Sequence, residues 1–231
     1  MAVLTISRQY GSGGDEIAEI ISKKTGYRIF DKHILAKAAF EEGLSEQEIV
    51  DYSEDQYKAQ TFFERLFGRT KPVAQMGTWV EVKGGVRIAE KISLSEEQAL
   101  SFVRKAVKSA YQLGDMIIVG RGGQVILKDH PDVLHVRIEA PLEERLLRVR
   151  GYPEMTRQTF SDSVAARRVA QDLIEKSDAA STDYLKRFYN VDWSDFRLYH
   201  LIINTSMLSI EQAAGVIVGL VQQLERSPEP V

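Results

Sequence analysis

The chain has 231 residues, of which 44% are hydrophobic and 27% are charged, and its formal net charge is −3. This composition is typical of a soluble globular protein, and the length suffices for one substantial α/β domain with an insertion. The small negative charge gives no support for general polyanion binding, so no nucleic acid partner is expected. The absence of cysteine excludes disulfides, a thiol nucleophile and a Cys-ligated metal.

The apolar segments near the two ends set the expectation about location. The first apolar run is only a few residues long and Arg8 follows it, unlike the apolar stretch of a signal peptide. The segment 210–224 is apolar but shorter than a bilayer span, and Gln and Gly interrupt it. We therefore expect a cytoplasmic protein with no membrane partner.

Residues 2–21 have the pattern of a strand, a glycine turn and a helix. Val3–Ile6 is a short apolar run of the kind found in buried strands. The next segment, Gly11–Gly14, can turn sharply and expose its amide groups, and helical spacing of apolar residues then begins at Ile17. Because amide groups at a helix start point at anions, this loop predicts a phosphate site. The alternative is a tight turn without a ligand.

The loop departs from the two best-known nucleotide motifs. In the pattern GxxxxGK[ST], Arg8 stands in place of the first Gly, Gly14 in place of the Lys and Asp15 in place of the hydroxyl residue. The dinucleotide pattern GxGxxG lacks its third Gly, although Asp31 follows Gly11 by 20 residues. A dinucleotide enzyme is therefore a third hypothesis, against which the missing Gly argues.

Four further short apolar strands are expected, near residues 27–30, 116–120, 133–138 and 200–204, and each precedes a predicted helix. This alternation predicts a parallel sheet with helices on both faces.

Three polar residues are expected at the carboxyl ends of these strands. Asp31, Arg121 and Asn204 would gather with the glycine loop at one edge of the sheet, where such folds bind ligands. Arg121 lies in a second glycine-rich turn, and its planar guanidinium suits phosphate. Each residue also has a plain structural interpretation: Asp31 as a helix N-cap, and Arg121 as a surface ion pair.

Two long segments carry helical patterns. Residues 41–95 combine an acidic run with an aromatic patch at 62–67, and predict an inserted helical subdomain or a mobile lid. Residues 143–150 predict a helix with Arg145 and Arg148 one turn apart. A long helix over 156–176 is expected next, followed by a polar joint at 178–181 and a further helix to about residue 189.

Six segments together resemble the cytidylate-kinase-like family, a branch of the nucleoside monophosphate kinases among the P-loop NTPases. They run in order from residue 2 to about 220: LTISRQYGSGGDEIAEII, YRIFDKHIL, IIVGRGGQVIL, VRIEAPLEERLLRVR, FYNVDW and LIINTSMLSIEQA. The resemblance implies a three-layer α/β fold with a five-stranded parallel sheet. It also implies a single domain over 1–231, with 41–95 as a monophosphate-binding insertion and 145–190 as a lid.

The activity implied by the resemblance is transfer of the ATP γ-phosphoryl group to a nucleoside monophosphate such as CMP, with Mg²⁺. The expected partners are small nucleotides, and the sequence leaves open whether the protein forms a homodimer. The implied site residues are Arg8, Gly11, Ser12, Gly13 and Gly14 for the ATP phosphates, Asp31 and Arg121 for the monophosphate, Arg121, Arg145 and Arg148 for catalysis, and Asp15 and Glu16 for the metal.

Three departures from the family pattern support an alternative, a nucleotide-binding protein that has lost catalysis and acts through partners. The loop Lys is missing, Asp15 follows the glycines, and Ser181 replaces the Arg of a lid DxxR motif. Asp15 and Glu16 could favour the helix N-terminus instead of holding Mg²⁺. Arg8 or Arg168 could replace the lost cation, and the sequence leaves these choices open.

Overall fold

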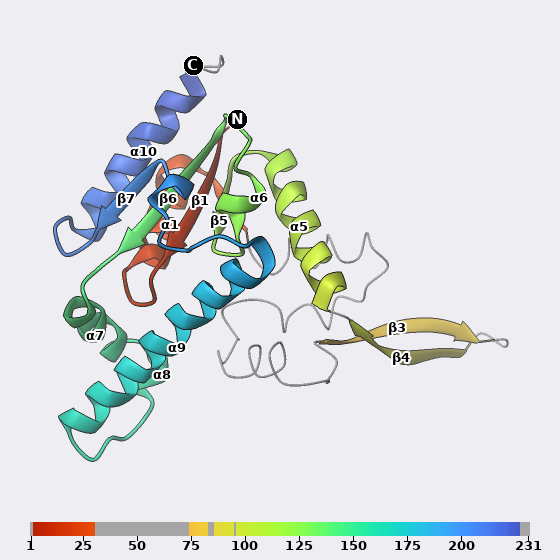
Figure 1. Ribbon diagram of the computed structural model, residues 1–231, viewed down its shortest axis with the longest axis horizontal. Coiled ribbons are helices and arrows are strands. Elements are labelled where there is room, and N and C mark those ends of the chain that lie inside the picture. Colours follow the sequence, from red (N-terminus) through yellow and green to blue (C-terminus); the bar gives the residue numbers. More distant parts are fainter. Residues whose placement is uncertain (1, 31–73, 83–85, 95, 227–231) are drawn as a thin grey trace. The chain divides into compact units, whose positions relative to one another are not determined.

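The computed structural model describes residues 2–30, 74–82, 86–94 and 96–226 (Figure 1). Backbone contacts divide the chain into two units, one formed by 1–29 with 113–231 and the other by 30–112. Asp31, the acidic run and the aromatic patch at 62–67 lie outside the described residues.

A five-stranded parallel sheet forms the centre of the first unit. Its strands are β1 (Val3–Arg8), β2 (Arg28–Ile29), β5 (Met116–Val119), β6 (Val133–Glu139) and β7 (Leu201–Asn204), in the order β2-β5-β1-β6-β7. All five predicted strands are thereby confirmed. Because β1 is central, the loop at its carboxyl end lies between the ends of β5 and β6.

Two helices cover one face of this sheet, α1 (Gly14–Thr25) and α10 (Ile210–Arg226). Apolar side chains from both helices pack on alternate residues of the strands, as period-two strands and period-3.6 helices allow. The centre of this core consists of Leu4, Ile6, Ile17, Ala18, Ile21, Ile117, Leu134, Val136, Ile138, Ile203, Ala213, Ala214, Ile217 and Val221, all buried.

The other helices of the first unit follow β5 and β6. They are α6 (Gly123–Ile126), α7 (Leu142–Arg150), α8 (Pro153–Thr156) and α9 (Ser163–Tyr189), with a 3-10 turn at Phe196–Leu198. The prediction of a joint at 178–181 is wrong, because these residues continue α9 without a break. Ala179, Ala180 and Ser181 are compatible with a helix interior, so the expected polar interruption does not form.

The described part of the second unit contains a hairpin and a helix. Strands β3 (Ala74–Val82) and β4 (Val86–Leu94) pair antiparallel, and α5 (Glu96–Leu113) begins shortly after β4 and extends one residue past the unit. The expected helical character of the insertion is therefore wrong over 74–82 and 86–94. Residues such as Val80, Ile88 and Ile92 favour strands, and the scattered glycines obscured their pattern in the sequence. None of the helices in the described residues is both long and apolar enough to cross a membrane.

Polar side chains occupy the other face of the sheet near β1 and β6. Thr5 and His135 lie opposite each other in register, and Thr5 Oγ1 lies 2.7 Å from His135 Nδ1. The His135 ring stacks on His200, with 5.0 Å between centroids and 8° between planes. His135 is only 4% exposed, and its Nε2 has no hydrogen-bond partner among the described residues. Burial first, and then the neighbouring His200, lower the pKa of His135 from 6.5 to about 4.

This buried histidine makes the stability of the fold depend on pH. The unfolded chain takes up the proton below pH 6.5, whereas the folded chain resists it until about pH 4. The contribution of neutral His135 to the free energy of unfolding is therefore fully present above pH 6.5. About 3 kcal/mol of it is lost as the pH falls from 6.5 toward 4. We expect His135→Asn to flatten this part of the curve of unfolding free energy against pH, measured by urea denaturation. Identical pH slopes for the two proteins would contradict the assignment.

Candidate functional site

The loop between β1 and α1 has the shape of an anion cradle. Gly11 and Gly13 have φ angles of 78° and 86°, which glycine adopts readily, and Gly13 is the N-cap of α1 without a side-chain cap. The first amide groups of α1 have no acceptor within the helix, and the helix dipole adds partial positive charge there. Ser12 is fully buried in this loop, and its Oγ has no hydrogen-bond partner among the described residues. These donors suit phosphate oxygens.

Close packing explains why the loop contains glycine. A Cβ on Gly11 would lie 2.7 Å from Val149 Cγ2 and 3.1 Å from the Arg145 carbonyl oxygen, both on α7. A Cβ on Gly13 would overlap the side chain of Ile210, at the start of α10. The loop is therefore pressed between two helices and has no room for side chains at these positions.

Hydrogen bonds fasten the loop to the ends of neighbouring strands. The Gln9 amide donates to the carbonyl of Ile138 over 3.0 Å, and the Ala140 amide donates to Gln9 Oε1 over 3.1 Å, so Gln9 ties the loop to the end of β6. Thr205, which follows β7, donates from Oγ1 to the Ser12 carbonyl over 2.7 Å. The conformation of the loop thus depends on both strands.

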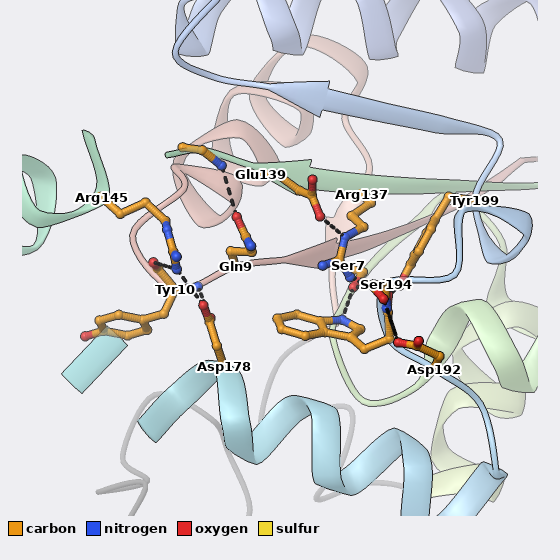
Figure 2. Close-up of polar contacts among 12 residues, drawn as sticks. Ser7, Gln9, Tyr10, Arg137, Glu139, Arg145, Asp178, Asp192, Ser194 and Tyr199 are labelled. Atoms are coloured by element: carbon orange, nitrogen blue, oxygen red, sulfur yellow. Dashed lines mark hydrogen bonds and ion pairs between the residues drawn. The ribbon is translucent and has the colours of Figure 1, made fainter. Parts of the chain in front are cut away.

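Asp178 on α9 joins the loop to α7, as Figure 2 shows. Its Oδ1 accepts from the amide of Tyr10 over 2.9 Å, and its Oδ2 accepts from Arg145 over 2.5 Å. Arg145 also donates to the Tyr10 carbonyl over 3.3 Å. The Arg145 side chain is 10% exposed, so this is a largely buried charge pair.

Arg148, one turn further along α7, also contacts the loop. It donates to Thr205 Oγ1 over 3.0 Å and to the Thr205 carbonyl over 2.9 Å, and more weakly to the Gly11 carbonyl at 3.4 Å. The structure therefore brings both arginines predicted as catalytic to the glycine loop. Arg145 bonds to Tyr10 and Asp178, and Arg148 bonds to Thr205. Their catalytic role stays a prediction.

The two carboxylates predicted to bind metal lie in the first turn of α1. Asp15 Oδ1 is 3.1 Å from Arg8 Nε, and Glu16 accepts from the Tyr152 hydroxyl over 3.3 Å. Burial first, and then Glu16 and Asp15, raise the pKa of Tyr152 above its usual value. The described residues hold no cluster of three metal-binding side chains. Mg²⁺ bound with a nucleotide needs only one or two carboxylates beside the phosphates, so the pair fits that use.

Arg121 lies in the second glycine turn, which begins at the end of β5. Its φ of 56° places it in the left-handed region. The Gly120 amide donates to the Ile6 carbonyl over 2.9 Å, so this turn is joined to the end of β1. Asn204 has a local role instead, since its Oδ1 accepts from the amide and hydroxyl of Ser206.

A buried polar cluster around Arg137, beside the start of the loop, was not predicted as part of the site. Arg137 on β6 is 3% exposed, pairs with Glu139 and donates to the Trp193 carbonyl over 2.6 Å. Its Cζ lies 4.3 Å from the centroid of the Trp193 ring, and Trp193 Nε1 donates to Ser7 Oγ over 2.7 Å. Figure 2 shows Arg137, Ser7 and Tyr199 together. The only signal in the sequence was a polar residue at every second position of β6. This alternation does not indicate which residues Arg137 contacts.

The comparisons with known proteins agree with this architecture. A model of the "Cytidylate kinase-like family" matches residues 3–207. The chain belongs to this family.

Two curated relatives of the family match along nearly their whole length. A cytidylate kinase of Methanocaldococcus jannaschii is 25% identical over 228 residues, covering 97% of this chain and 99% of the relative. A cytidylate kinase of Sulfurisphaera tokodaii is 23% identical over 216 residues, covering 93% of this chain and 92% of the relative. A solved structure of an uncharacterised protein from Eubacterium ventriosum shares the fold, with a TM-score of 0.58 at 18% identity over 96% of this chain and 99% of that one.

Family membership supports a nucleotide or nucleoside kinase kind of function for this α/β protein with a P-loop fold. It also implies that the family-wide use of nucleotide substrates extends to this chain. The glycine loop, the turn with Arg121 and the arginines of α7 all lie within the matched residues.

The buried pair between Asp178 and Arg145 predicts a specific loss of stability. Asp178→Ala would remove the acceptor of the Tyr10 amide and the carboxylate partner of a largely buried guanidinium, and Arg145 Nε already lacks a partner among the described residues. We expect the free energy of unfolding to fall by about 2–4 kcal/mol in denaturant titrations. Asp172→Ala, at an exposed position on the same helix, is the matched control and should change it by less than about 0.5 kcal/mol. Equal effects of the two substitutions would show that the pair does not hold the loop.

Proposed function

We propose that this protein is an ATP-dependent kinase that phosphorylates a nucleoside monophosphate such as CMP, with Mg²⁺. The observation that carries the proposal is the cradle of residues 11–14, with two glycines at positive φ, a buried Ser12 hydroxyl and the uncapped start of α1. The names of the curated relatives support cytidylate as the acceptor class.

The loop would hold the triphosphate by its amide groups. Gly13 and Gly14 bring backbone donors to the helix start, and Ser12 Oγ adds a hydroxyl from within the fold. Positioning of this kind, together with neutralisation of charge, does most of the work in phosphoryl transfer, because the protein forms no covalent bond. The loop contains no catalytic nucleophile paired with a general base, which is consistent with that chemistry.

In the proposed reaction, a phosphate oxygen of the monophosphate attacks the γ-phosphorus of ATP. The bond from that phosphorus to the β–γ bridging oxygen breaks, and ADP leaves with the electron pair. Bound Mg²⁺ would neutralise charge on the phosphate oxygens, with Asp15 and Glu16 as its protein ligands. Arg121, on the turn beside β1, would contact the acceptor phosphate, and Arg145 and Arg148 would stabilise the transferred group.

One observation favours a second candidate, a nucleotide-binding protein without turnover. Arg145 is engaged by Asp178, and the position three residues on, where the DxxR pattern has Arg, is Ser181. An arginine at the transition state can be worth about 10³–10⁵ in rate. If Arg145 stays paired when nucleotide binds, the chain keeps binding and loses most of its catalytic power.

A nucleotide panel separates the two candidates. The purified protein is melted with ATP and Mg²⁺, and with each of several nucleoside monophosphates, while ADP production is measured in parallel. At a ligand concentration 100 times Kd the expected stabilisation is about 2.7 kcal/mol, which raises Tm by several degrees. Diphosphate production with CMP or another acceptor supports the kinase. Stabilisation without turnover supports the second candidate, and no shift with any nucleotide contradicts both.

A further inference from the structure

Two departures of the loop from the standard phosphate-loop pattern lie in contact with each other. The pattern GxxxxGK[ST] has glycine at the position of Arg8 and lysine at the position of Gly14, so this chain has the large and small residues exchanged. A Cβ built on Gly14 would lie 2.5 Å from Cβ and 2.8 Å from Cγ of Arg8. Real Cβ atoms essentially never approach another atom closer than 3.0 Å. A side chain at position 14 is therefore incompatible with the arginine at position 8.

Backbone conformation does not account for the glycine at position 14. Unlike Gly11 and Gly13, Gly14 does not have a positive φ, and it is the first residue of α1. Glycine is among the poorest helix formers, because it loses the most backbone freedom on folding. The space occupied by the Arg8 side chain is the physical reason for glycine at this position.

The charge of Arg8 is held at the helix start. Arg8 Nε lies 3.1 Å from Asp15 Oδ1, with the arginine side chain 20% exposed and the aspartate 66% exposed. An ion pair with one side in solvent contributes little stability, so the pair with Asp15 does not prevent a bound phosphate from contacting the guanidinium. The pair places the Arg8 side chain at the first turn of α1, which follows the glycine loop. Arg168, the other cation considered as a replacement, is exposed on α9.

We infer that Arg8 supplies from the end of β1 the positive charge that lysine supplies from position 14 in the standard loop. Relative to the standard pattern, the residues at positions 8 and 14 are then exchanged together, and each depends on the other. The aliphatic part of Arg8 occupies the space of the lysine side chain, and its guanidinium contacts the terminal phosphates of a nucleoside triphosphate. This inference rests on the proposed function for the identity of the ligand. Its steric half, the conflict between side chains at 8 and 14, is independent of any ligand.

The steric half is tested by a double-mutant cycle on thermal stability. Gly14→Ala should lower Tm because its Cβ meets Arg8. In the background of Arg8→Gly the same change should be neutral or stabilising, since the conflict is gone and alanine favours the helix. Additive effects of the two substitutions would overturn the coupling.

The charge half is tested by the affinity for ATP, measured calorimetrically with and without Mg²⁺. Arg8→Met keeps much of the aliphatic stem without charge and should raise Kd for ATP at least tenfold, while Arg8→Lys should stay within a few-fold of the parent. Binding of adenosine, which has no phosphate, serves as the control ligand and should be equal in all variants. Arg8→Met with the parental affinity for ATP would overturn the assignment.

A charge transplant gives the sharpest form of the test. The double variant R8G/G14K restores both positions of the standard pattern and should recover at least tenfold of the ATP affinity lost in R8G alone. R8A/G14K is the matched control, because alanine keeps the Cβ that conflicts with position 14, and it should not recover. Failure of R8G/G14K to bind better than R8G contradicts the exchange. If the parent protein itself does not bind ATP, the proposed function fails, and the stability cycle still decides the steric half.

Discussion

The candidate site depends on the packing that presses the glycine loop between β1, α7 and α10. Each glycine of this loop from 11 to 14 has a neighbour where its side chain would lie: Val149 and Arg145 at Gly11, Ile210 at Gly13 and Arg8 at Gly14. The backbone is thereby held with its amide groups at the start of α1 uncapped. A preorganised set of donors loses little entropy when an anion binds, and this is how a loop without a lysine can still be a phosphate site.

The same constraint connects binding to the arginines of α7. Asp178 accepts hydrogen bonds from one amide of the loop and one guanidinium of α7, so it joins α7, α9 and the loop. A ligand that draws Arg145 toward itself must separate it from Asp178 or share it. Under the proposed function, the strength of that pair would decide between efficient transfer and binding alone, since a buried pair is costly to break.

The sequence predicted the sheet well and the surroundings of the loop less well. Alternating apolar strands and helices located all five strands, and the glycine loop identified the edge where the candidate site lies. The continuous α9 was missed because Asp178–Ser181 has the composition of a polar joint. In the structure, Asp178 lies within the helix and accepts hydrogen bonds from Tyr10 and Arg145. The partners of Arg137 and Arg148 were also missed. These contacts join residues far apart in the chain, such as Arg148 and Thr205, and local periodicity carries no information about them.

The central claim is that the amide groups at residues 11–16 receive the phosphates of a nucleotide. The most direct measurement is a titration of ¹⁵N-labelled protein with ATP and Mg²⁺, followed by amide chemical shifts. We predict that the largest perturbations fall on Gly11, Ser12, Gly13, Gly14 and Asp15, and that adenosine leaves these amides unchanged. Saturable binding of ATP that leaves these amides unperturbed, or moves them no more than adenosine does, would contradict it.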